Sequence, residues 1–297
     1  MQSWHTTYLG LRELPREIST FELQSFFTYS RTERELINAR RSNAHKLGLA
    51  LHIGFLRLSG RLLNSVRIVP TTLWRHLGDE IGITAVELAS LRALYVRGRT
   101  LFDHQQLACD VLGFHWMTEH QRRALVRTLR DEVARCADRD QLLVFARRWL
   151  YQSKILILRD RDIRVLVTAA LGQLEEETAK TIAASVLPEQ LVRWRDAMAA
   201  LRPDGQTQQS WLWSAPAKHS TKLERLDALN VHKHLDDLSC LIVRRYARRL
   251  ASRPPSVGAR IKEPARTVEV GCFLRHCLFT STDQAILMVQ RRVADLW

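Results

Sequence analysis

The spacing of the apolar residues is the feature that most restricts how this chain can fold. From residue 160 onward the apolar positions recur at intervals of three and four, at Ile163, Leu166, Val167, Ala170, Leu171 and Leu174. On a helix this spacing forms one apolar stripe, and no segment shows the convincing alternation of a half-buried strand. Gly (12) and Pro (8) are also scarce among the 297 residues, which disfavours a fold with many tight turns. The sequence therefore predicts an all-α fold.

Capping-box signatures, in which Ser or Thr is followed three residues later by Glu or Gln, predict where helices begin. They stand at Thr32, Thr118, Thr221 and Ser281, each just before a helical pattern. Asp160 is also well placed to cap the helix that follows it.

Two segments that mix Pro, Gly and polar residues interrupt the helical pattern, at residues 202–220 and 253–264. Such segments mark loops and domain boundaries. We therefore expect a string of small helical modules that includes helix-turn-helix-like pairs. The expected division is an N-terminal module at 1–68, a helix-turn-helix-like module at 69–137, a helical module at 138–200, a linker at 201–220 and an Arg-rich module at 221–297.

The net charge points to the class of partner. The chain has 45 Lys and Arg residues against 31 Asp and Glu residues, a formal net charge of +14. A surplus of this size favours a polyanion, because contacts with phosphates release counterions. Only seven of the 45 basic residues are Lys. Arg grips phosphate and guanine bidentately, although a genome rich in G and C also explains the ratio.

Residues 69–98 resemble a helix-turn-helix, with a first helix that ends at Gly82 and a second that has Thr84 near its start. In this motif the first residues of the second helix reach base edges in the major groove. We therefore expect DNA contacts from Thr84, and from Arg97 and Arg99 beyond that helix. Short helix pairs also occur in proteins that bind no DNA.

The next helix pair repeats this plan, and its second helix, which Thr118 would cap, carries four arginines. Phosphate contacts are expected from Arg122, Arg123, Arg127 and Arg130.

The densest charge lies at residues 244–266, where eight basic residues accompany one acid, Glu263. Like charges four residues apart on a helix cost about 0.2–0.5 kcal/mol per pair, so an anion is expected to bind there. On a helical wheel Arg245 and Arg249 fall within the apolar arc, which leaves internal pairing open as the alternative for these two. The predicted phosphate contacts are Arg244, Arg245, Arg248, Arg249, Arg253, Arg260, Lys262 and Arg266.

Catalytic and metal-binding patterns are weak. The acid clusters at residues 160–162, 175–177 and 236–237 are better explained as helix caps and solvated faces. His232 and His234, two residues apart, point to opposite sides of a helix. Cys272 and His276 are four residues apart but have no further ligand at zinc spacing. No catalytic residue and no metal site is predicted.

Several segments together resemble the N-terminal region of the Tn-three-type replicative transposases of bacteria. The segment with the most specific likeness is HKLGLALHIGFLRLSG at residues 45–60, where glycines interrupt an apolar helical run. The other segments that carry the resemblance lie at residues 13–27, 69–78, 99–114, 262–278 and 291–297.

The resemblance implies small helical modules that bind double-stranded DNA at the terminal inverted repeats of a transposon. It also implies that catalysis belongs to an RNase-H-like Asp-Asp-Glu domain further along the family's chains. That domain would bind the divalent metal, so no enzyme activity and no cofactor are expected here. The pattern stops at Trp297 without a helix cap, which suggests that more protein follows; a helix that docks its Trp in the core is the alternative.

Two other functions remain open at this stage. A truncated remnant could act as a protein-interaction module or an inhibitor, by pairing with full-length transposase or with itself through an apolar patch around Trp211, Trp213 and Trp297. An RNA-binding helical protein would need a stacking surface, which 7% aromatic residues do not make evident. Five cysteines without a CxxC pair, no signal peptide and no apolar run of about 18 residues indicate a cytoplasmic protein with no membrane partner. Binding to bacterial DNA would make it nucleoid-associated.

Overall fold

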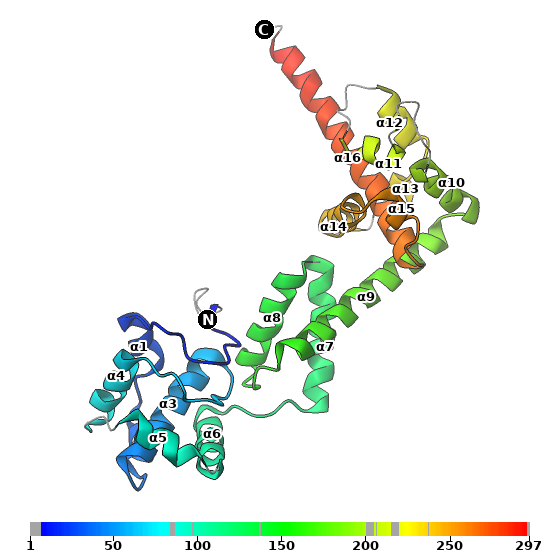
Figure 1. Cartoon of the computed structure of the whole chain (residues 1–297). Helices are drawn as coiled ribbons and strands as arrows, with labels where there is room; N and C mark the ends of the chain where they lie inside the picture. Colours follow the sequence, from blue (N-terminus) through cyan, green and yellow to red (C-terminus); the bar gives the residue numbers. More distant parts are fainter. Residues whose placement is uncertain are drawn as a thin grey trace. The chain divides into compact units, whose positions relative to one another are not determined.

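The computed structural model describes residues 7–83, 87–96, 98–136, 138–199, 205, 207–214, 220–236 and 238–295. Across these residues the chain forms sixteen helices and no strand (Figure 1), and His115 and Ile155 form an isolated bridge. The all-α prediction is confirmed. The chain divides into two compact units: unit 1 comprises residues 1–126 and 143–166, and unit 2 comprises residues 127–142 and 167–297.

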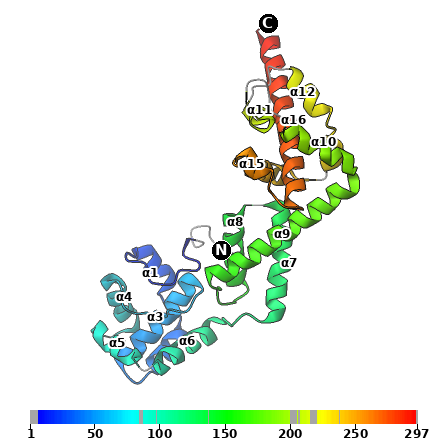
Figure 2. The ribbon, with the colours of Figure 1, turned by 45° about the vertical axis from the view of Figure 1, so that its right-hand side comes forward.

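Unit 1 is organised around one buried helix, α3 (Asn43–Ser59). Its side chains from Leu47 to Leu56 are almost all inaccessible to solvent, and the other helices of residues 20–112 pack against it (Figures 1 and 2). These are α1 (Thr20–Phe26), α2 (Arg31–Asn38), α4 (Thr71–Ile81), α5 (Leu88–Tyr95) and α6 (Arg99–Leu112). Three further helices carry residues of both units: α7 (Glu119–Arg135), α8 (Arg139–Gln152) and α9 (Asp160–Ser185).

Two glycines of α3 explain how its neighbours approach so closely. A Cβ atom on Gly54 would lie 2.1 Å from the ring of Phe27, and one on Gly48 would lie 2.5 Å from the Tyr95 hydroxyl. Both positions therefore require the absence of a side chain, although glycine costs a helix interior about 1 kcal/mol relative to alanine. The apolar helix interrupted by glycines in residues 45–60 is the packing centre of unit 1.

Unit 2 is organised around α16 (Ala265–Ala294), which contacts α10 (Pro188–Ala199), α12 (Ser220–Asp227), α13 (His232–Leu235) and α14 (Cys240–Ala251). The first half of α16 is buried and includes Phe273 and Leu274. Its second half projects beyond the other helices of the unit (Figure 2). It exposes about half of each of Ile286, Leu287, Val289 and Val293.

Local signals predicted some helix ends and missed others. Thr118 and Gln121 form the expected reciprocal cap, and Gly82 ends α4 with the left-handed backbone that glycine favours. The cap of α2 is Ser30 with Glu33 instead of Thr32, and Ser19 with Glu22 caps α1. Ser281 lies within α16, so the prediction of a new helix there was wrong.

Asp160 and the polar segments also differ from expectation. Asp160 is the first residue of α9, and its carboxylate binds Arg61 and Arg147. The predicted linker at 201–220 contains α11 (Gln208–Ser214), which buries Trp211 and Leu212 in the core of unit 2. The segment at 253–264 likewise contains a short helix, α15 (Pro255–Gly258). The division into five modules stays a prediction.

Candidate nucleic-acid interface

The Arg-rich segment begins on α14, where burial separates its arginines into two pairs. Ile242, Val243, Tyr246, Ala247 and Leu250 face the core of unit 2. Arg244 and Arg248 lie on the opposite face and are exposed, whereas Arg245 and Arg249 are half-buried at its edges. Only the first pair is exposed along this helix.

Arg249 and Arg253 are already bound to acidic side chains. Arg249 lies 3.1 Å from a carboxylate oxygen of Glu175 and 2.7 Å from one of Glu269, and Arg253 lies 2.6 Å from the other oxygen of Glu269. Glu269 is fully buried, and burial raises its pKa even though both arginines favour its charged form. The alternative of internal pairing is thus realised for Arg249, and these two guanidinium groups stabilise the packing of α14 on α16.

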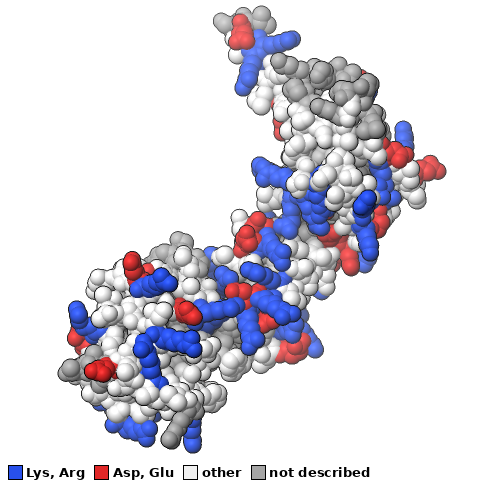
Figure 3. Space-filling model, in the orientation of Figure 1, with Lys and Arg blue, Asp and Glu red and all other residues white. Residues whose placement is uncertain are grey.

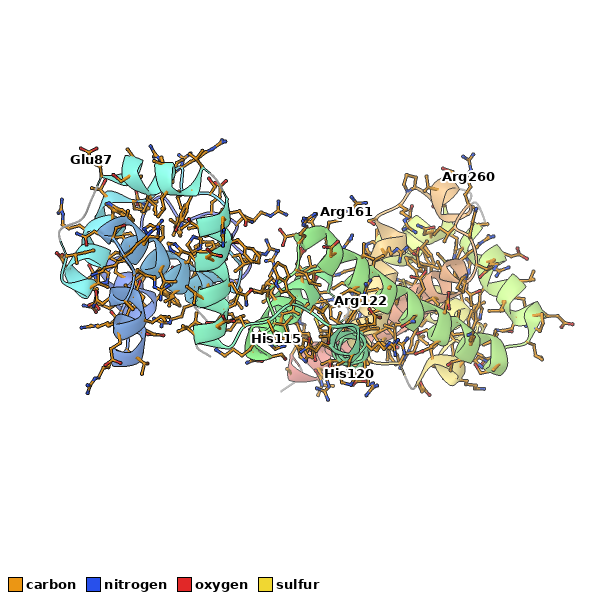
Figure 4. All side chains as sticks on the ribbon, turned by 90° about the horizontal axis from the view of Figure 1, so that it is seen from below. Glu87, His115, His120, Arg122, Arg161 and Arg260 are labelled. Atoms are coloured by element: carbon orange, nitrogen blue, oxygen red, sulfur yellow. The ribbon has the colours of Figure 1, made fainter. Side chains whose placement is uncertain are left out.

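The remaining basic residues of the segment have no acidic partner in the described part of the chain. Arg260 and Lys262 are exposed and Arg266 is half-buried; Figure 4 shows Arg260 at the margin of its unit. The one acid of the segment, Glu263, binds Arg195 and Thr267. Burial, and then Arg244 and Arg248, lower the pKa of His276. The four exposed cations of the segment, Arg244, Arg248, Arg260 and Lys262, are together called the unit 2 basic surface below.

The four predicted arginines of α7 are all exposed. Arg122 is labelled in Figure 4. Arg123 lies 3.8 Å from Glu119 one turn earlier, a surface pair of little energetic weight. Arg130 donates a hydrogen bond to Gln173. Arg122 and Arg127 have no such partner among the described residues, so α7 presents cations that an anion can reach.

The predicted helix-turn-helix is only partly described. Thr84 and Arg97 lie outside the described residues, and α5 spans Leu88–Tyr95 instead of the longer second helix that we expected. Arg99 is exposed at the start of α6. Base readout by residues 69–98 stays a prediction.

Sequence reasoning missed two basic residues near Arg99 in space. Arg40 and Arg41 line a cleft with Arg99 in unit 1. The signal was present as the run RRSNAHK at residues 40–46, but only the fold brings it to the start of α6. Basic side chains are spread over both units on the face shown in Figure 3.

The structure gives little support to other kinds of site. Among the described residues no group of three or more His, Cys, Asp or Glu side chains is arranged to hold a metal ion. Cys272 is buried, and His276 lies against the ring of Trp213. Trp211 is buried, Trp213 is 41% exposed and Trp297 lies outside the described residues. No described helix has the length and apolar character needed to cross a membrane.

Comparison with known proteins identifies the family to which the chain belongs. A model for DUF4158, a domain of unknown function, matches residues 6–170. The chain belongs to this family. It is 69% identical over 305 residues to the transposase for insertion sequence element IS1071 in transposon Tn5271 of Comamonas testosteroni, and the match covers 100% of this chain and 31% of that protein. It is 24% identical over 212 residues to the transposase for transposon Tn1546 of Enterococcus faecium, a match that covers 69% of this chain and 21% of that protein.

These matches confirm the resemblance to the N-terminal region of a bacterial transposase. The chain spans less than a third of the length of either relative.

Proposed function

We propose that this chain binds double-stranded DNA at the terminal inverted repeats of its own transposon, as the N-terminal region of a transposase acting in transposition. The single observation that carries the proposal is the unit 2 basic surface. Its exposed residues Arg244 and Arg248 are like charges one helical turn apart, and neither has an acidic partner in the described structure. Such a pair is destabilising until an anion occupies it.

DNA phosphates fit this surface better than a small anion does. Two further exposed basic residues, Arg260 and Lys262, follow α14 in the sequence, and a DNA backbone offers phosphates at regular intervals to several cations at once. The net charge of +14 and the transposase relatives support the same partner. In this proposal phosphate contacts come from unit 2 and α7, while base readout belongs to residues 69–98.

The proposal is tested by measuring the affinity of the chain for two duplexes over a salt series. One duplex carries the terminal repeat that borders the gene, and the other is its scrambled sequence. If six to ten phosphates are engaged, affinity falls by about 10³–10⁵ between 50 and 200 mM salt. The terminal duplex is expected to bind at least 10-fold more tightly than the scrambled one. Equal affinity for both overturns the sequence-specific part.

A pair of charge reversals tests the role of the unit 2 basic surface. Arg244→Glu with Arg248→Glu is expected to weaken both duplexes alike by at least 10-fold and to flatten the salt dependence. Arg291→Glu with Arg292→Glu, an exposed pair near the end of α16, makes the same change in charge and is expected to have a smaller effect. If the two double variants weaken binding equally, net charge alone explains the affinity and the assignment of this surface fails.

The proposal assigns no catalytic residue and no divalent metal to this chain, and it locates the protein with the bacterial nucleoid through its DNA partner. Cutting and joining of DNA would then belong to other parts of the transposase. A nuclease assay with supercoiled plasmid and Mg²⁺ tests this assignment, with no cleavage expected.

A further inference from the structure

The cleft in unit 1 that Arg40, Arg41 and Arg99 line belongs neither to the unit 2 basic surface nor to α7. Its volume is about 520 Å³, and its walls come from the loop between α2 and α3, the start of α3 and α6 as far as Leu107. Three arginines face one acid in the lining, Asp103. None of the three arginines forms an ion pair with a carboxylate in the described structure, so the cleft carries an uncompensated positive charge.

Arg41 is held in place by a relay of hydrogen bonds. Its Nε donates to Nε2 of His45 over 3.0 Å, and Nδ1 of His45 lies 2.8 Å from the Ser42 hydroxyl. This arrangement requires a neutral imidazole, because Nε2 must accept. Burial, and then Arg41 and Arg40, lower the pKa of His45 and favour that form. The guanidinium of Arg41 is thus positioned before any ligand binds.

Arg40 adds a donor that the protein itself leaves unused. Its Nε is buried and has no hydrogen-bond partner, which is uncommon for a buried polar atom and calls for an explanation. Because this atom is closed to solvent, a ligand oxygen in the cleft that Arg40 lines would reach it only after a small movement of the Arg40 side chain.

Two helix N-termini at the cleft are also left without a side-chain cap. Gly98 precedes α6 and has no side chain, and Ser42 precedes α3 but makes no cap hydrogen bond because its hydroxyl meets His45. The first N–H groups of a helix lack acceptors within the helix and carry a partial positive charge, so they favour an anion. Thr100, in the first turn of α6, lines the cleft directly.

From these features we infer that the cleft binds one phosphate group of a DNA backbone, held by Arg40, Arg41, Arg99 and the start of α6. The inference rests on the proposed function, because it takes DNA as the partner, and it adds a second anchoring point in unit 1. A backbone phosphate fits because it offers several acceptors to guanidinium forks and helix N–H groups at once.

The test compares two triple variants of the full chain that remove the same charge from unit 1. The first carries Arg40→Gln, Arg41→Gln and Arg99→Gln. The matched control carries Arg16→Gln, Arg67→Gln and Arg148→Gln, three exposed residues of unit 1 that lie outside both the cleft and residues 69–98. Affinity for a scrambled duplex is measured over a salt series, and thermal unfolding verifies that both variants fold.

We expect the cleft variant to lose at least 10-fold in affinity and to show a salt slope flatter by about 1, as for the loss of one phosphate contact. We expect the control to lose less than 3-fold. Equal losses in the two variants, or no loss in the cleft variant, overturn the inference and leave the proposed function standing. If the unaltered chain binds neither duplex, the proposed function fails and the inference fails with it.

Inorganic phosphate distinguishes the source of the ligand. Free phosphate at 10 mM, matched in ionic strength with chloride, is expected to compete only weakly, because it lacks the neighbouring contacts of a backbone. Full displacement of the duplex from the unaltered chain by this concentration would identify a free-phosphate site and contradict the inference.

Discussion

Replacing Asp160 with Asn would measure how much a cluster of ion pairs stabilises unit 1. Its carboxylate accepts from Arg61 over 2.9 Å and from Arg147 over 3.0 Å, and Arg12 lies 3.6 Å away. The Arg61 side chain is only 9% exposed. It also donates to the carbonyl groups of Gly10, Ile157 and Leu158. Asp160→Asn therefore leaves a buried guanidinium with its backbone partners and without its counterion.

The expected cost follows from these contacts. Hydrogen bonds to charged groups contribute about 1.5–3 kcal/mol each, and the asparagine oxygen retains one of the two at reduced strength. Arg12 is 66% exposed and adds little. We expect the free energy of unfolding of unit 1 to fall by about 2 kcal/mol, which is a ~30-fold rise in the population of its open state. Hydrogen exchange of the α3 amides measures this population.

Asp162→Asn is the matched control, because Asp162 also lies in the first turn of α9 but is exposed and forms no ion pair among the described residues. It removes the same favourable interaction with the helix dipole, about 0.3–1 kcal/mol. Equal exchange rates in the two variants would refute the role given to the arginine cluster.

The pH dependence supplies a second check. Burial alone would raise the pKa of Asp160, but Arg61 and Arg147 hold it below its ordinary value of 3.8. The stabilisation is therefore complete above pH 3.8 and is lost as the pH falls through the lower folded pKa. The difference between the unaltered chain and Asp160→Asn should vanish in that range.

Three further predictions concern packing, acid and capping. Gly54→Ala should destabilise unit 1 by about 1–3 kcal/mol through its clash with Phe27. Gly172→Ala should stabilise its helix by up to about 1 kcal/mol, because a Cβ there meets no atom within 4 Å. Urea unfolding measures both effects. Burial lowers the pKa of His52 to about 3 and of His104 to about 4. Each histidine should therefore lower the free energy of unfolding of unit 1 by about 2 kcal/mol as the pH falls from above 6.5 to 5. Replacing both with Gln should reduce this acid sensitivity. Thr118→Ala should cost α7 about 1 kcal/mol by removing its cap, seen as faster exchange of its first amides.

Local chemistry predicted the parts of the fold that depend on neighbours in sequence. The helical stripe after residue 160, the end of α4 at Gly82 and the cap at Thr118 were all found in the structure. The predictions were wrong where tertiary contacts outweighed the local helix-start and loop signals. Ser281 resembles a helix start but is buried inside α16. The polar segment before residue 220 contains α11, because Trp211 and Leu212 pack in the core of unit 2.

The candidate sites were harder to predict because charge pairing is decided in space. The helical wheel left internal pairing open for Arg249, but it could not identify the partner Glu175, which lies 74 residues away in the sequence. In unit 1 Arg40 and Arg99 line the same cleft although they lie far apart in the sequence. No spacing in the sequence predicts that these two residues are close in space. The net charge predicts a polyanionic partner. The fold is needed to show which basic side chains have no acidic partner and are available to bind it.

The close approach at Gly54 has a consequence for how this protein can change over time. Phe27 occupies the volume that a side chain at position 54 would need, so neither residue is free to vary by itself. A lineage that acquires a larger residue at 54 must shrink residue 27 as well, and the intermediate with only the first change is poorly stable. Positions 27 and 54 should therefore vary together among relatives, as a coupled pair that links the end of α1 to the middle of α3.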